Sequence, residues 1–253
     1  IKTNYNSTLD SGDYSSWNRI LSTYMNYEKL DGSDYNDSIS IIEFMIFDNL
    51  NSNSIVNIIS MARENARSVQ EHISRELWLS VNKYYLTVIE KKLIKKFRKK
   101  DTMEFLNDMI KFHHIYNSVS DVTQERGNAF FFMNVGKYIE RISQSLDFLN
   151  VKINSLDYEN ENFYADTFFW KNLLISIGGY QFYVKTYKSV FNIENIVEII
   201  VLNQFFPRSI SFSINKIERH IKILNDINKP DDNILKFMLG KLKNNLMYTT
   251  IDS

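Results

Sequence analysis

SIVNIISMARENARSV, residues 54–69, carries a hydrophobic pattern that recurs in SISFSINKIERHIKIL, residues 209–224. The match extends upstream without a gap, so that residues 41–69 lie over residues 196–224 at a constant offset of 155 (196 − 41). A repeat of this kind identifies the unit from which a fold is built. We therefore interpret the chain as an internal duplication.

The repeated pattern is that of an amphipathic α-helix. Its apolar positions are spaced by four, three, four and three residues, which places them along one face of a helix and excludes a strand. They are Ile55, Ile59, Ala62, Ala66 and Val69 in the first copy, and Ile210, Ile214, Ile217, Ile221 and Leu224 in the second. Ser54 and Ser209 precede these helices and are predicted N-caps, because a serine hydroxyl can accept a hydrogen bond from a first-turn N–H.

The duplication extends further when small gaps are allowed. Trp17 matches Trp170, and Ile1 aligns with Val151. A long predicted helix precedes Val151, whereas the first copy starts at Ile1. We therefore expect that the first copy lacks its first helix.

The composition indicates an all-helical protein with no charge bias. The chain has 253 residues with two prolines and seven glycines, which permits long helices. Its 30 basic and 30 acidic residues give no general attraction to nucleic acid or to an anionic membrane. Cysteine is absent, and no apolar run reaches the roughly 18 residues of a membrane span. We expect a cytoplasmic protein that does not bind membranes.

The predicted fold class is all-α, with about ten helices in a single bundle built from the internal duplication. The predicted helices cover residues 16–29, 37–48, 54–73, 75–99, 102–121, 126–153, 165–190, 193–203, 209–227 and 231–248. We expect one domain over residues 1–253. Its parts are repeat 1 (1–73, lacking its first helix), central helices (74–122), repeat 2 (125–228) and a C-terminal helix (231–248).

A run of cations lies at the end of one predicted helix. It consists of Lys91, Lys92, Lys95, Lys96, Arg98, Lys99 and Lys100. Cations at this place complement the negative end of the helix dipole, and exposed charge runs are usually solvated. Because no base-stacking or base-reading pattern accompanies the run, a nucleic-acid-binding bundle is a distant alternative.

No pattern predicts a metal site or a cofactor. Helical di-iron bundles use Glu-x-x-His pairs, and none of the four histidines follows a glutamate by three residues. Phosphate-loop and dinucleotide-binding motifs are also missing from the sequence. We therefore expect neither a metal nor a cofactor.

The first candidate site is a group of polar residues in the first repeated helix. Arg63 and Asn65 flank its apolar stripe, whereas Glu64 and Arg67 lie on the far face. The simplest interpretation is pairing within the helix, of Glu64 with Arg67 and of Arg67 with Glu71.

The second candidate site surrounds Glu140. Its predicted helix carries apolar residues at 130–133 on all sides, and helices of that kind are usually buried. We expect Glu140 to lie between two layers and to need a charged partner. Lys137, one turn earlier, is the nearest candidate, and Arg63 or Arg208 is the alternative.

Four motifs follow one another across essentially the whole chain. They are Ala62-Arg63-Glu64-Asn65-Ala66-Arg67-Ser68-Val69, Glu76-Leu77-Trp78 with Asn82, Gly136-Lys137-Tyr138-Ile139-Glu140-Arg141, and Phe206-Pro207-Arg208-Ser209-Ile210. In this order they resemble the bacterial alpha-E domain family. Members of that family usually begin with a helix that carries a Gly-Arg-Tyr-x-Glu-Arg type motif, which agrees with the helix expected before Ile1. Lys137 stands where that motif usually has arginine, so this position lacks the fork needed for bidentate binding of an anion.

The resemblance implies a role in peptide chemistry. Family members are typically encoded beside, or fused to, ATP-grasp amide ligases and transglutaminase-like proteins, sometimes near proteasome-like peptidases. Our first interpretation is a non-enzymatic binding or scaffold partner of such a protein in peptide modification or turnover. The candidate binding residues are Arg63, Glu64, Asn65, Arg67, Arg141 and Arg208.

The alternative interpretation is an enzyme of the same pathway. Glu140 is then the candidate catalytic acid or base. Arg63, Arg67 or Arg208 would hold a carboxylate or a phosphate of the substrate.

Overall fold

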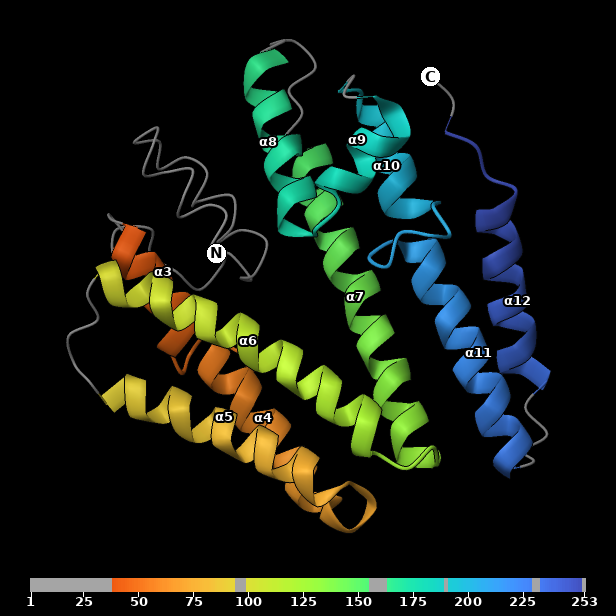
Figure 1. Cartoon of the computed structure of the whole chain (residues 1–253). Helices are drawn as coiled ribbons and strands as arrows, with labels where there is room; N and C mark the ends of the chain where they lie inside the picture. Colours follow the sequence, from red (N-terminus) through yellow and green to blue (C-terminus); the bar gives the residue numbers. More distant parts are fainter. Residues whose placement is uncertain (1–37, 94–98, 155–162, 189–190, 229–232, 252–253) are drawn as a thin grey trace. The chain divides into compact units, whose positions relative to one another are not determined.

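The computed structural model describes residues 38–93, 99–154, 163–188, 191–228 and 233–251 (Figure 1). Within these ranges it contains ten α-helices, one short 3₁₀ helix and no strand, which confirms the all-α fold class. The chain divides into two compact units, Ile1–Phe130 and Phe131–Ser253. The single bundle and the internal duplication stay predictions.

The first unit packs α4 against both α3 and α5, and α5 against α6. Its helices are α3 (Ser38–Phe47), α4 (Ile55–Ser68), α5 (Arg75–Leu93) and α6 (Lys99–Thr123), with the 3₁₀ helix η2 (Gln70–His72) between α4 and α5. The core draws apolar side chains from all four α-helices, among them Ile46, Ile59, Val88 and Phe105. Complete burial of a side chain of this size contributes about 1.5–3 kcal/mol to the free energy of unfolding.

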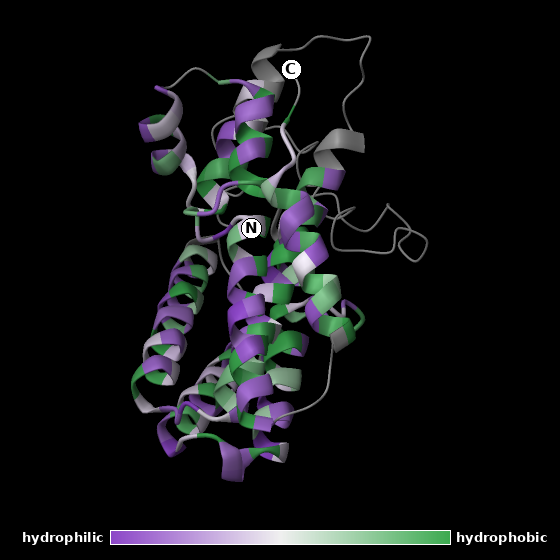
Figure 2. Cartoon of the chain, turned by 90° about the vertical axis from the view of Figure 1, so that its right-hand side faces the viewer, coloured by the Kyte–Doolittle hydropathy of each residue, from purple (hydrophilic) through white to green (hydrophobic). Residues whose placement is uncertain are grey.

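The second unit holds most of α7 and all later helices. These are α7 (Asn128–Asn154), α8 (Phe163–Ser176), α9 (Tyr180–Tyr187), α10 (Ile193–Val201), α11 (Ile210–Asn228) and α12 (Asn233–Met247). The core of this unit includes Leu149, Trp170, Leu174, Tyr183, Ile199 and Phe206. Hydrophobic and hydrophilic residues mix along single helices (Figure 2), as expected of helices that bury one face.

The turns before α4 and α11 contain the same hydrogen bonds. Asp48 accepts a bond on its side chain from the N–H two residues later (2.7 Å), and Asn203 does the same (2.8 Å). The cap residues Ser54 and Ser209 each accept from the N–H three residues later, over 3.3 and 3.0 Å. Both predicted N-caps are therefore confirmed. Because Asp48 and Ser54 lie 155 residues before Asn203 and Ser209, this shared geometry supports the predicted duplication.

The two copies of the apolar stripe are buried to different extents. In α4, Ile59 is buried but Ala62 and Val69 are exposed. Val69 has left the helix, since its φ is −120°. In α11 four of the five stripe positions are buried, namely Ile210, Ile214, Ile217 and Leu224. The helical period was therefore predicted correctly, but it does not fix how deeply each copy packs.

One predicted helix, residues 165–190, is two helices, and that prediction is wrong. The chain turns at Gly178, whose φ is +70°, a conformation that glycine adopts without strain. The N–H of Gly179 then donates to the carbonyl of Leu174 over 2.7 Å, which closes the end of α8. A Cβ on Gly179 would lie 3.0 Å from the ring of Phe206, so this position admits no side chain without a shift. The glycine pair in the sequence was the signal for this break.

The structure describes both ends of the cationic run at residues 91–100, whereas Lys95, Lys96 and Arg98 lie outside the described residues. Lys91 and Lys92 lie in the last described turn of α5, where they complement its dipole. Lys99 and Lys100 begin α6. The predicted helix at 16–29 and the match of Trp17 lie outside the described residues.

Candidate functional site

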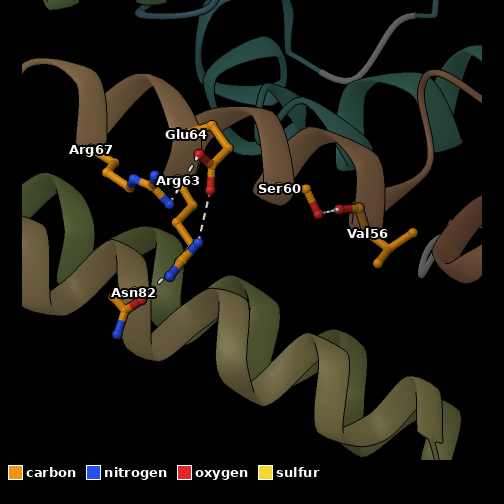
Figure 3. Close-up of polar contacts among 6 residues, drawn as sticks. All are labelled: Val56, Ser60, Arg63, Glu64, Arg67 and Asn82. Atoms are coloured by element: carbon orange, nitrogen blue, oxygen red, sulfur yellow. Dashed lines mark hydrogen bonds and ion pairs between the residues drawn. The ribbon is translucent and has the colours of Figure 1, made fainter.

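Arg63 connects α4 to α5 in the first unit (Figure 3). Its Nε donates a hydrogen bond to the side-chain oxygen of Asn82 over 2.8 Å, and its Nη1 donates to Glu64 over 2.8 Å. The guanidinium carbon lies 4.7 Å from the ring centre of Tyr85 and 5.8 Å from that of Trp78, within range for cation–π attraction. Only 24 % of the Arg63 side chain is exposed. Arg63 is thus a bridge that joins two of the motifs.

The other polar residues of the first motif lie at the surface. Glu64 pairs with Arg67 at 3.7 Å, as predicted. The predicted pair of Arg67 with Glu71 is wrong, because α4 ends at Ser68 and Glu71 lies in η2. Asn65 and Arg67 are both exposed. Of the four candidates on α4, Arg63 is therefore the one that links the helix to its neighbour.

Helix α7 buries one face. Phe131, Tyr138 and Leu149 are buried, whereas Phe132 is 60 % exposed and Ile139 is 55 % exposed. Residues seven positions apart share a helix face, so Phe132 and Ile139 mark the outer side. The expectation that this helix is buried on all sides is therefore wrong.

Glu140 lies on the outer side of α7. Its side chain is exposed, and Oε1 accepts a hydrogen bond from Nε2 of Gln144, one turn later, over 2.8 Å. The expectation that Glu140 is buried between two layers is therefore wrong. Glu140 lies on the outer side because α7 buries its other side, which carries Phe131, Tyr138 and Leu149.

A row of polar residues on α7 faces α11. Lys137, Arg141 and Ser145 recur every four residues and share one side of the helix. The hydroxyl of Ser145 donates to the backbone carbonyl of Arg208 over 3.2 Å, which fixes the start of α11 beside this row. The side chains of Arg141, on α7, and of Arg208, in the turn before α11, therefore start from neighbouring points.

A second row runs along α11 with the same spacing. Arg208 precedes the helix, and Phe212, Lys216 and His220 follow at intervals of four residues. The ring of Tyr138 lies between the rows, with its centre 6.3 Å from that of Phe212 and 6.0 Å from that of His220. We call Lys137, Arg141, Arg208 and Lys216, with these three rings, the cationic seam.

The aromatic rings of the cationic seam lie against its cations. The Lys137 Nζ is 5.1 Å and the Arg141 Cζ is 5.2 Å from the ring centre of Tyr138. The Lys216 Nζ is 5.1 Å from the ring centre of Phe212. These contacts hold the cations in place by cation–π attraction, and the guanidinium group of Arg141 keeps N–H donors that can bind an anion.

The pKa values of two groups in the cationic seam, Arg208 and His220, are lowered. The pKa of the half-buried Arg208 guanidinium is lowered, first by desolvation and second by the charge of Arg141. The pKa of His220 is lowered by desolvation and then by Lys137, Lys216 and Arg219. In both groups burial is the larger cause, and the positive charge of the neighbouring cations adds to it.

This positive charge is only weakly compensated. In the part of the chain that the structure describes, no carboxylate forms an ion pair with Arg141, Arg208 or Lys216. The nearby Glu218 is paired with Lys243 of α12 at 2.6 Å instead. The seam is therefore suited to an anionic group supplied from outside the described residues.

The sequence identified part of this site. Arg141 and Arg208 were predicted as binding residues, and the structure places them beside each other. Tyr138, Lys216 and His220 were not predicted as members of the site. The signal that was available for α11 is the four-residue spacing from Arg208 to His220, but the sequence did not show that this row faces α7.

We predict that His220 makes the protein less stable in acid. The unfolded chain protonates this side chain near its ordinary pKa of 6.5, whereas the folded protein takes up that proton at lower pH. Between the two values the unfolded state binds more protons, so the free energy of unfolding falls as the pH falls. Urea unfolding at about pH 7 and about pH 5 measures the difference.

The matched variants for this prediction are His220→Gln and His114→Gln. His220→Gln reduces the loss of stability between the two pH values. His114 is exposed on α6, and its replacement leaves His220 in place, so this variant keeps the parent's loss. Equal losses in the parent and in His220→Gln contradict the assignment.

The chain belongs to the Alpha-E family, described as a predicted alpha-helical domain with a conserved ER motif, whose model matches residues 1–253. Glu-Arg pairs occur in this chain at 125–126, 140–141 and 218–219. The second of these pairs supplies Arg141 to the cationic seam. Neither the curated proteins nor the solved structures include a match to this chain.

The described residues contain no group of three or more histidine, aspartate or glutamate side chains placed to hold a metal ion. No helix in the same part of the chain has both the length and the apolar character needed to cross a membrane.

Proposed function

We propose that the chain is a non-enzymatic helical binding module of a peptide modification or turnover system in the cytoplasm. It acts beside an ATP-grasp amide ligase or a transglutaminase-like protein and binds that protein or its peptide substrate. The observation that carries the proposal is the cationic seam, in which two helices direct positive side chains to one place. Membership of the Alpha-E family supports the helical character of the module.

The form of the cationic seam favours binding. Lys137, Arg141 and Lys216 lie against aromatic rings, so these side chains lose less freedom when an anionic group arrives. Arg141 lies on α7 and Arg208 lies in the turn before α11, so the two can hold one group from two sides. Glu140, the candidate acid or base, lies on the open face of α7, without the enclosed, water-poor surroundings in which enzymes usually hold such groups.

Calorimetry with the two purified candidate partners tests the proposal. The full-length chain is titrated with the ATP-grasp ligase or transglutaminase-like protein encoded beside it, with and without nucleotide. We expect binding to one of them, weakened about tenfold or more in Arg141→Gln, because truncating one side of a buried charged contact costs at least that much. Arg67→Gln, which removes an exposed arginine of the first unit, keeps the parent's affinity. Binding to neither protein contradicts the module.

A reconstituted reaction separates the module from the enzyme alternative. The ligase or transglutaminase-like protein is assayed with its peptide substrate in the presence of the parent chain or of Glu140→Ala. We expect the same yield of product from both. Loss of product with unchanged partner binding would establish the enzyme alternative, with Glu140 as its acid or base.

A further inference from the structure

We infer that the cationic seam binds a phosphate group, held between the guanidinium groups of Arg141 and Arg208. The inference rests on the proposed function and deepens it, because it names the chemistry of the anionic group that the module recognises. A phosphorylated peptide and a small phosphate ester present the same group.

One hydrogen bond and the helical spacing place Arg141 and Arg208 near each other. Ser145 touches the carbonyl of Arg208, and Arg141 lies one turn before Ser145 on the same side of α7. Residues four apart on a helix have Cβ atoms about 5–6 Å from each other. The two long side chains therefore start within reach of a common point from opposite sides of the cationic seam.

The rings of the seam orient the first arginine. The Arg141 guanidinium lies against the ring of Tyr138, and Lys137 lies against the same ring one turn earlier. Burial raises the pKa of Tyr138, so its hydroxyl keeps its proton and can donate to an anion. A ligand between the arginines thus meets guanidinium and hydroxyl donors together.

The positive charge of the cationic seam favours a phosphate group over a carboxylate as its ligand. Arg141, Arg208 and Lys216 bring three positive charges with no ion-paired carboxylate among the described residues. A carboxylate cancels one of these charges and offers two oxygens. A phosphate ester carries about −1.5 to −2 near neutral pH and offers three acceptor oxygens. The phosphate group can therefore accept from both guanidinium forks and cancel more of their mutual repulsion.

Titration of the full chain with inorganic phosphate tests the inference. Binding is followed by calorimetry and by the NMR signals of His220, against acetate and chloride at equal ionic strength. We expect saturable binding of phosphate and no saturable binding of acetate. The pKa of His220 rises when phosphate is bound, because a nearby anion offsets the cations that lower it.

Four variants locate the site. Arg141→Gln and Arg208→Gln each raise the dissociation constant for phosphate about tenfold or more, because each removes a charge-assisted pair of hydrogen bonds. Arg208→Lys keeps the charge but loses the fork, and it weakens binding by a smaller factor. Lys222→Gln removes one charge from an exposed position on α11 and leaves the constant unchanged. Circular dichroism verifies that every variant is folded.

Three results overturn the inference. They are no saturable binding of phosphate, equal binding of acetate, and equal binding of phosphate by the parent and both arginine-to-glutamine variants. Each of these can occur while the chain still binds its partner protein, which would leave the proposed function intact. Conversely, phosphate binding that depends on both arginines, in a chain that binds neither partner protein, overturns the proposed function alone.

Discussion

Replacing Leu174 by alanine lowers the free energy of unfolding of the second unit by about 2–5 kcal/mol. Leu174 lies in the last turn of α8 and is fully buried in a core that also contains Trp170 and Phe206. One of its methyl carbons lies 3.4 Å from the position of a Cβ on Gly179, so the space around it is filled by a tight turn. That turn cannot move into the gap easily, because its backbone bonds to the carbonyl of residue 174 itself.

The neighbouring residue provides the control for Leu174→Ala. Ile175 lies on the same helix, has a side chain of the same size and is 45 % exposed. We expect Ile175→Ala to cost less than about 1 kcal/mol, because nearly half of the residue's surface already meets water.

Urea unfolding, followed by the fluorescence of Trp170 with Trp17 and Trp78 replaced by phenylalanine, measures both variants in the unit that contains them. Equal losses for Leu174→Ala and Ile175→Ala would show that α8 does not pack as the structure has it.

Replacing Arg63 by methionine costs about 2 kcal/mol of stability in the first unit, since a charged, partly buried hydrogen bond and two cation–π contacts are lost. Methionine keeps an apolar stem of similar length, so the packing of that stem changes little. Asn82 is left with an unpaired oxygen between α4 and α5, which adds to the cost. Urea unfolding followed by far-ultraviolet circular dichroism measures the change.

Arg67 is the matched control for Arg63→Met. It lies one turn later on α4, pairs with the same Glu64 and is 64 % exposed. We expect Arg67→Met to change the free energy of unfolding by no more than about 0.5 kcal/mol. A double-mutant cycle of Arg63→Met with Asn82→Ala gives a coupling energy of about 1 kcal/mol. No coupling, or equal losses at the two arginines, would contradict a bridge at Arg63.

Local chemistry made parts of the fold predictable. Ser54 and Ser209 cap their helices as expected, because a cap needs only a hydroxyl and the N–H groups of the next turn. The break at Gly178 was also encoded locally, in a glycine pair, but the strong apolar pattern around it suggested one continuous helix. Helix caps and breaks of this kind can be predicted from the few neighbouring residues that form them.

The depth at which each helix face is buried was less predictable than the helical period of its apolar residues. The repeated apolar stripe was predicted to share one helix face, but Ala62 and Val69 of the first copy are exposed. The helix that carries Glu140 was expected to be buried all round, but Phe132 and Ile139 are exposed. A helical period states which residues share a face, whereas the depth of burial depends on which neighbours cover that face.

The sequence by itself determined that this protein is helical, where most of its helices begin and end, and which side chains share a face. These properties depend on contacts between residues three or four positions apart. The tertiary structure alone decided that Arg63 meets Asn82 and that Arg141 and Arg208 meet in one seam. Arg141 and Arg208 are 67 residues apart (208 − 141), and their approach depends on how α7 packs against α11. Packing of this kind depends on the fit of whole helix faces, which no short motif specifies.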